Sequence, residues 1–124
     1  MGGGTYRFFG WDGATPNQPV VASSSIGPNN TWQHVVGVYD QPAGRMKLYV
    51  NGVERGTAVP HATVVNTSHE VSIGARKVSS SAYDLNFDGR IDEVAIYNRA
   101  LAPDEILAHL NAALTNNAAA EARL

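Results

Sequence analysis

One tight turn constrains the fold of this chain more than any other local feature. Apolar and polar side chains alternate along residues 45–50, which is the period of a β-strand with one buried face. Asn51 and Gly52 follow, and both accept the positive φ that the centre of a type I′ turn requires. The sequence therefore predicts a hairpin in which residues 53–58 fold back on residues 45–50. We expect a buried face with Met46, Leu48 and Val50, and a solvent-exposed face with Arg45, Lys47 and Tyr49.

Gly, Pro and Asn interrupt the rest of the chain at short intervals, which is typical of many short strands. Residues 32–39 carry apolar side chains in both alternating sets, as expected for a strand that is covered on both faces. Long polar loops are expected at residues 13–19 and 77–86. We expect further strands at residues 5–11, 20–25, 71–75 and 87–97.

A helix is predicted only near the end of the chain, over residues 102–114. Its apolar residues recur at helical spacing and form one stripe, and two acidic residues near its start favour the positive end of the helix dipole. Residues 115–124 are Ala-rich and are expected to be a frayed or disordered tail, which leaves residues 1–114 as a single domain. The stripe consists of Ile106, Leu107, Leu110 and Leu114, and the acidic residues are Asp104 and Glu105.

Composition excludes several classes of protein. The chain has 124 residues, 44% of them hydrophobic, and a formal net charge of −2 without a basic stripe, which removes the electrostatic basis for nucleic-acid binding. It has no cysteine, so disulfides, thiolate metal sites and cysteine catalysis are excluded. No apolar run is long enough for a membrane span, and the first residues lack the features of a signal peptide.

Three segments in a fixed order carry a family resemblance. They are residues 31–40 (Thr-Trp-Gln-His-Val-Val-Gly-Val-Tyr-Asp), residues 48–52 (Leu-Tyr-Val-Asn-Gly) and residues 89–101 (Gly-Arg-Ile-Asp-Glu-Val-Ala-Ile-Tyr-Asn-Arg-Ala-Leu). Their order and spacing resemble the laminin-G-like branch of the concanavalin A-like lectin/glucanase superfamily. The resemblance covers about residues 31–110. It implies an all-β fold: an antiparallel two-sheet β-sandwich of jelly-roll topology with one short C-terminal helix.

The same resemblance implies a setting and a partner. It implies an extracellular or cell-surface location and a glycan or protein ligand. Family members usually carry more strands before the segment that begins near Trp32 than this chain has. The sandwich is therefore reduced, a fragment, or completed by another copy. Because exposed sheet edges invite pairing, we expect a homo-oligomer.

An acidic segment, residues 84–93, suggests a calcium site. Its spacing matches the start of an EF-hand loop, but Ala95 stands where the bidentate Glu belongs, and a β-like pattern follows instead of a helix. A Ca²⁺ loop of another type remains one interpretation, which calcium sites in the resembled superfamily support. The alternative is a solvated hairpin loop in which Asp92 bonds nearby backbone. The candidate metal ligands are Asp84, Asn86, Asp88 and Asp92.

Loop aromatic and polar residues suggest a ligand site at the rim of the sandwich. A flat apolar ring matches the C–H face of a sugar, although each such ring can instead pack between the sheets. We expect Trp32 and Tyr97 to belong to the core. The candidate ligand-binding residues are Trp11, Asp12, Arg76, Tyr83 and Asn86.

The carboxylates do not fit glycosidase chemistry. That chemistry needs two carboxylates that flank one bond, whereas Asp92 and Glu93 are adjacent and would face opposite sides of a strand. The histidine spacings fit no zinc pattern, and His34 is expected to be a structural hydrogen-bonding residue. We therefore predict a non-enzyme with no catalytic residues.

Three functions are compatible with these observations. The first is a non-catalytic binding module that recognises carbohydrate or a protein partner, with calcium dependence left open. The second is a structural domain that self-assembles without a small ligand. The third is an accessory domain of a hydrolase or an unrecognised glycosidase.

Overall fold

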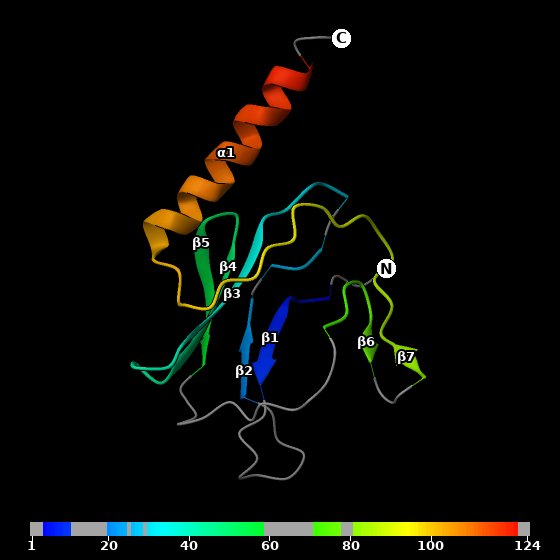
Figure 1. The fold of residues 1–124 in the computed structure, drawn as a ribbon, viewed down its shortest axis with the longest axis vertical. Coiled ribbons are helices and arrows are strands. Elements are labelled where there is room, and N and C mark those ends of the chain that lie inside the picture. Colours follow the sequence, from blue (N-terminus) through cyan, green and yellow to red (C-terminus); the bar gives the residue numbers. More distant parts are fainter. Residues whose placement is uncertain are drawn as a thin grey trace. The chain divides into compact units, whose positions relative to one another are not determined.

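The computed structural model describes residues 4–10, 20–24, 26–28, 30–58, 71–77 and 81–121. The chain divides into two compact units, Met1–Val65 with Tyr97–Leu124, and Asn66–Ile96. Figure 1 shows their elements. The described part of the larger unit contains β1 (Arg7–Gly10), β2 (Val20–Ser23), β3 (Val35–Asp40), β4 (Arg45–Val50), β5 (Val53–Ala58) and α1 (Pro103–Glu121), and that of the smaller unit contains β6 (Arg76–Lys77) and β7 (Tyr83–Asp84).

The larger unit has two antiparallel sheets, as the predicted fold class requires. One pairs β1 with β2, and the other has the order β3-β4-β5. Between β4 and β5, Asn51 has φ 52° and Gly52 has φ 76°, so both residues of the predicted turn adopt the positive φ expected of them. The predicted hairpin is confirmed at residues 45–58, with a register shift between Leu48 and Tyr49.

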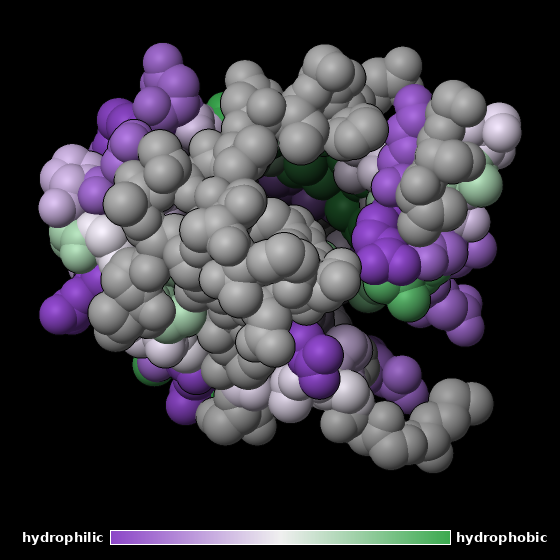
Figure 2. Space-filling view, turned by 90° about the horizontal axis from the view of Figure 1, so that it is seen from below, coloured by the Kyte–Doolittle hydropathy of each residue, from purple (hydrophilic) through white to green (hydrophobic). Residues whose placement is uncertain are grey.

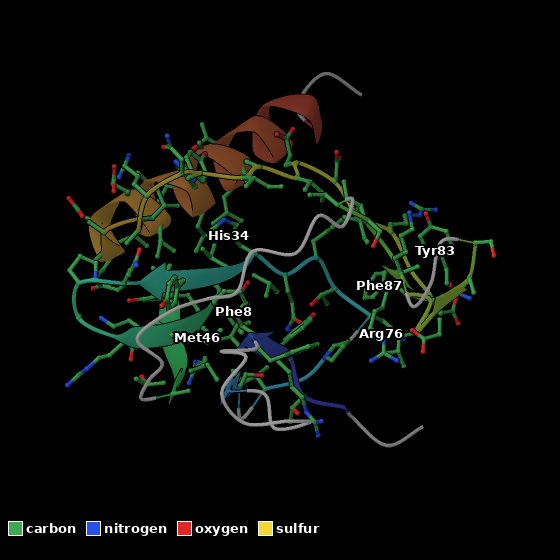
Figure 3. All side chains as sticks on the ribbon, turned by 60° about the horizontal axis from the view of Figure 1, so that its bottom comes forward. Phe8, His34, Met46, Arg76, Tyr83 and Phe87 are labelled. Carbon is green, nitrogen blue, oxygen red and sulfur yellow. The ribbon has the colours of Figure 1, made fainter. Side chains whose placement is uncertain are left out.

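One face of the β3-β4-β5 sheet packs against the β1-β2 pair. Met46 and Leu48 are 2% exposed there and form a cluster with the fully buried Ala22. Figure 3 shows Phe8 and Met46 between these layers, and Phe8 packs against the cluster. The approach is close because Gly37 has no side chain: a Cβ at this position would lie 2.6 Å from the Phe8 ring.

The opposite face of the sheet is covered by the first turns of α1. Ile106 is fully buried against Val38 and Tyr49, and Leu101 packs beside them. Tyr49 is only 3% exposed, so the prediction that it lies on a solvent-exposed face was wrong. The side chains of β4 alternate as predicted, but the helix covers the face of the strand that carries Tyr49. The predicted buried residues Met46, Leu48 and Val50 are confirmed.

The helix begins where local chemistry favours a start. Pro103 occupies the first helical position, where its missing N–H costs nothing. The Glu105 carboxylate accepts the Ala102 N–H at 2.8 Å and pairs with Arg99 at 2.6 Å. The helix continues past residue 114 to Glu121, through a stretch rich in alanine, the strongest helix former. In the part of the chain that the structure describes, no helix is long and apolar enough to cross a membrane.

Two expected strands and two expected core residues are corrected by the structure. Residues 71–75 and 87–97 do not form strands. The second segment has the alternation of a strand, but Glu93 interrupts it with a φ of 52°. Trp32 is 62% exposed and Tyr97 is 44% exposed, so neither belongs to the core. Trp32 lies before β3 begins, and most of its side chain is in solvent.

The Glu105 contacts predict a specific acid sensitivity. Its bonds to Arg99 and to the Ala102 N–H lower the pKa of Glu105 from 4.5 to about 2. A carboxylate with a lowered folded-state pKa stabilises the fold above its unfolded pKa, and this contribution is lost as the pH falls from about 4.5 to about 2. We expect Glu105→Gln to lower the melting temperature at pH 6 and to reduce its decline between pH 4.5 and 2.

Circular dichroism melts of both proteins across this range measure the effect. Asp104→Asn is the matched control, because Asp104 is the exposed neighbouring acid in the same first turn. An acid decline that is equally steep in the wild type and in Glu105→Gln would refute the assignment.

Candidate functional site

The smaller unit presents a short hairpin that holds a fixed ion pair. In the β6-β7 ladder, Arg76 stands opposite Asp84 and Lys77 opposite Tyr83. The Arg76 Nε donates to Asp84 Oδ1 at 2.8 Å, and its Nη2 donates to Oδ2 at 2.5 Å. This two-point contact fixes the planes of both groups and leaves their outer edges in solvent, with side chains 53% and 41% exposed.

The ion pair also sets the charge of the site. The hydrogen bonds from Arg76 hold the pKa of Asp84 below its usual value, although the carboxyl is exposed. Asp84 is therefore ionised at neutral pH, but both of its oxygens already accept bonds from a cation. A calcium ion at Asp84 would compete with Arg76 for the same oxygens.

Backbone contacts close the loop around this hairpin. The Phe87 N–H donates to the Gly74 carbonyl at 2.7 Å, and the Ser72 hydroxyl donates to the Ala75 carbonyl at 2.7 Å. Gly74 and Leu85 both have positive φ, 78° and 49°. These contacts hold the two ends of the hairpin together, so the site has a defined backbone.

Three of the five predicted ligand-binding residues lie on this hairpin or directly after it. Arg76 is exposed on β6, Tyr83 is 52% exposed on β7, and Asn86 is exposed just beyond. Because neighbours on a strand face opposite sides, Tyr83 projects away from the face that carries the Arg76–Asp84 pair, as Figure 3 also shows. The other two, Trp11 and Asp12, lie outside the described residues.

Three of the four candidate calcium ligands lie in an exposed segment of the chain. Asn86, Asp88 and Asp92 are all exposed. Asp92 Oδ1 accepts the Glu93 N–H at 2.9 Å, which is the local backbone bond that the alternative interpretation gave it. Within the described ranges, no three His, Cys, Asp or Glu side chains gather in a way that could hold a metal. The calcium site stays a prediction.

The smaller unit carries several large apolar side chains that are exposed. Figure 2 shows that the visible described surface of the chain carries hydrophobic residues beside strongly hydrophilic ones. Exposed apolar groups next to polar ones are a feature of interaction sites. The large hydrophobic residues of the smaller unit with exposed side chains are Val71, Ile73, Tyr83, Leu85, Phe87, Ile91, Val94 and Ile96.

The backbone at Asp92 and Glu93 is not that of a strand. Asp92 and Glu93 were expected to face opposite sides of a strand, but residues 91–97 do not form one. Alternation therefore does not decide how the two carboxylates are oriented. Both are exposed, and the contact between these residues is the bond of Asp92 to the backbone of Glu93.

Sequence reasoning missed a second cluster of polar residues, in the larger unit. His34 and His109 lie at the contact between sheet and helix, and the His109 ring packs on Tyr97 with centroids 5.6 Å apart. Histidine spacing along the chain does not reveal this cluster. The helical spacing does offer a signal, because His109 follows Ile106 by three residues and so shares its buried face.

Comparison with known families agrees with the observed architecture. The family model Laminin_G_3, described as the concanavalin A-like lectin/glucanases superfamily, matches residues 1–107. The chain belongs to this superfamily. Its two antiparallel sheets and C-terminal helix are those of a laminin G-like domain, and laminin G-like domains are typically non-catalytic binding modules.

Two individual proteins are similar to this laminin G-like domain. Adhesion G-protein coupled receptor D1 from Homo sapiens is 33% identical over 95 residues, which is 73% of this chain and 10% of the receptor. The chain thus spans about a tenth of that relative. A crystal structure of an S-layer domain-containing protein from Clostridium thermocellum superposes with a TM-score of 0.50 and 21% identity, and the match covers 86% of this chain and 63% of the other. This second likeness concerns the fold alone.

Proposed function

We propose that this laminin G-like domain is a non-catalytic module that binds carbohydrate at the cell surface or outside the cell. The observation that carries the proposal is the exposed β6-β7 hairpin, where an aromatic ring and a fixed pair of planar polar groups stand on the same short ladder. The family and the name of the related adhesion receptor support a binding role in that setting.

The chemistry of the hairpin suits a sugar. The exposed Tyr83 ring offers an apolar surface to the C–H face of a pyranose. Arg76 and Asp84 hold each other's planes, so their remaining donors and acceptors meet hydroxyl groups with little loss of side-chain entropy. The Asn86 amide adds a donor and an acceptor just beyond β7. Since Tyr83 and Arg76 face opposite sides, the sugar would lie along the hairpin edge.

A glycan array tests this function with one variant and one control. We expect the wild type to bind a subset of glycans and Tyr83→Ser to lose at least tenfold in affinity, which equals about 1.4 kcal/mol. Trp32→Ser is the matched control, because Trp32 is also an exposed aromatic, 62% exposed, but belongs to the larger unit. Absence of glycan binding, or equal binding by Tyr83→Ser, would contradict the proposal.

The same array run with EDTA tests calcium dependence. The proposed ligands are Asp84, Asn86, Asp88 and Asp92, and calcium would have to share Asp84 with Arg76. If calcium belongs to the site, EDTA lowers binding and added Ca²⁺ raises the melting temperature by mass action. Unchanged binding and melting would contradict a calcium site at these residues.

A second candidate function is binding of a protein, including another copy of the chain. The observation that favours it is the exposure of Val71 (74%), Leu85 (70%) and Ile96 (75%). Such a surface gains from being covered by another apolar surface. Light scattering tests the case of a second copy, because self-association gives a mass that rises with concentration in the absence of any glycan.

A further inference from the structure

His34 is held firmly at the start of β3, where the sheet meets the helix. Its backbone N–H donates to Asn51 Oδ1 at 2.9 Å, and its carbonyl accepts the Asn51 N–H at 2.8 Å. Asn51 belongs to the rigid turn between β4 and β5. Figure 3 shows the His34 side chain between β3 and α1. These two bonds tie the backbone of His34 to the β4-β5 turn.

One ring nitrogen of His34 lacks a hydrogen-bond partner among the described residues. Nδ1 is buried and has no hydrogen-bond partner among the residues that the structure describes. A neutral imidazole can leave this nitrogen as a bare lone pair at moderate cost. A protonated imidazole places an unpaired N–H, and part of a positive charge, at the same buried point, which costs considerably more.

The helix lies against the turn that holds His34: a Cβ at Gly52 would be 3.2 Å from the Leu107 side chain and 3.3 Å from that of Leu110. His109 lies on α1 three residues after the buried Ile106, and its ring packs on Tyr97. Burial, and then the positive charge of His109, lowers the pKa of His34. A proton on His34 is therefore less favourable while α1 is docked.

The other polar groups nearby have partners other than His34. Glu105, one turn before His109, is bonded to Arg99 and to the Ala102 N–H, and the charge of His109 further lowers its pKa. Tyr49, which packs against Ile106 from β4, donates its hydroxyl to Glu54 on β5. Tyr97 contacts His109 through its ring. The carboxylates of Glu105 and Glu54 are thus bonded to other partners, and none of these bonds is made to His34.

We propose that His34 forms a pH-sensitive latch, which lets α1 dock on the β3-β4-β5 sheet when its imidazole is neutral and releases it when the imidazole is protonated. Release uncovers the face that Val36, Val38 and Tyr49 share with Ile106. Mild acid would thus expose an apolar surface that neutral pH keeps closed. The latch operates in the larger unit and does not depend on the proposed glycan site.

The direction of the pH dependence follows from how many protons the docked and released states bind. With a lowered pKa in the docked state, His34 binds a proton more readily once the helix has left. Docking is therefore strongest above the ordinary histidine pKa of 6.5. Below it, the equilibrium shifts toward release by up to about tenfold per pH unit, until the docked form also takes up the proton.

Hydrogen exchange of the α1 amides in the full chain tests the latch. After correction for intrinsic rates, we expect the protection of residues 106–114 to fall about tenfold between pH 7.5 and 5.0 in the wild type. His34→Gln should remove most of this fall. His61→Gln, another histidine of the chain, should retain it. A fall that is equal in His34→Gln, or no fall in the wild type, would overturn the proposal.

A second measurement needs no variant and applies even if His34→Gln does not fold. An NMR titration of the imidazole C–H signals in the wild type gives the pKa of His34 directly. The latch requires a value below the ordinary 6.5. A value of 6.5 or higher would refute it.

Discussion

Replacement of Leu48 by alanine is expected to remove a large part of the stability of the domain. Leu48 is 2% exposed at the centre of β4, in the cluster between the β1-β2 pair and the β3-β4-β5 sheet. Removal of a buried Leu side chain costs the transfer energy of its methyl groups and the energy of the cavity, together about 2–5 kcal/mol. Typical domains have only about 5–15 kcal/mol in total.

Urea denaturation of the wild type and Leu48→Ala measures this loss. Leu85→Ala is the matched control, because Leu85 is 70% exposed and the same atoms are removed. We expect the control to change the free energy of unfolding by less than about 0.5 kcal/mol. A loss below about 1 kcal/mol in Leu48→Ala would show that this layer of the core is not packed as described.

Ile106→Ala is expected to have a comparable effect through the other face of the sheet. Ile106 is fully buried and is the helix residue that packs directly on Val38 and Tyr49. Its truncation should cost about 2–5 kcal/mol in the free energy of unfolding. It should also loosen α1 before the sheet unfolds, because the helix loses its central contact.

Thermal melts followed by far-ultraviolet circular dichroism, together with exchange of the helix amides, separate these two effects. Leu114→Ala serves as the control, since Leu114 lies on the same helix and is 59% exposed. If Ile106→Ala and Leu114→Ala melt at the same temperature, the helix does not hold this face of the sheet.

The sequence was most informative where the determinants of the structure are local. The β4-β5 hairpin was predicted at its observed bounds, because the alternation of residues 45–50 and the conformational demands of Asn51 and Gly52 are both local. The burial of Tyr49 was missed because it depends on the helix that covers it, which follows more than fifty residues later. Alternation identifies two faces of a strand but not what covers each of them.

Residues 87–97 show a case in which a local pattern gave the wrong prediction. Their alternation predicted a strand, but the backbone turns to positive φ at Glu93 and does not pair. A strand needs a partner as well as a pattern, and pairing is a long-range property that the segment itself does not encode.

The candidate site was predictable in part for the same reasons. Arg76, Tyr83, Asp84 and Asn86 were chosen for their chemistry, and the structure places all four on or beside one hairpin. The direct bond between Arg76 and Asp84 was not foreseen, because their spacing of eight residues becomes a contact only when β6 and β7 pair. The contact of His34 with the helix region was missed for a similar reason.

Chemical-shift mapping tests the central claim most directly. The ¹⁵N-labelled domain would be titrated with the glycan that binds best on the array, and the shifts of its backbone amides recorded. Carbohydrate binding at the β6-β7 hairpin predicts that the largest changes fall within residues 76–86 and disappear in Tyr83→Ser. Changes centred on β3, β4 and β5, or no change at saturating glycan, would contradict it.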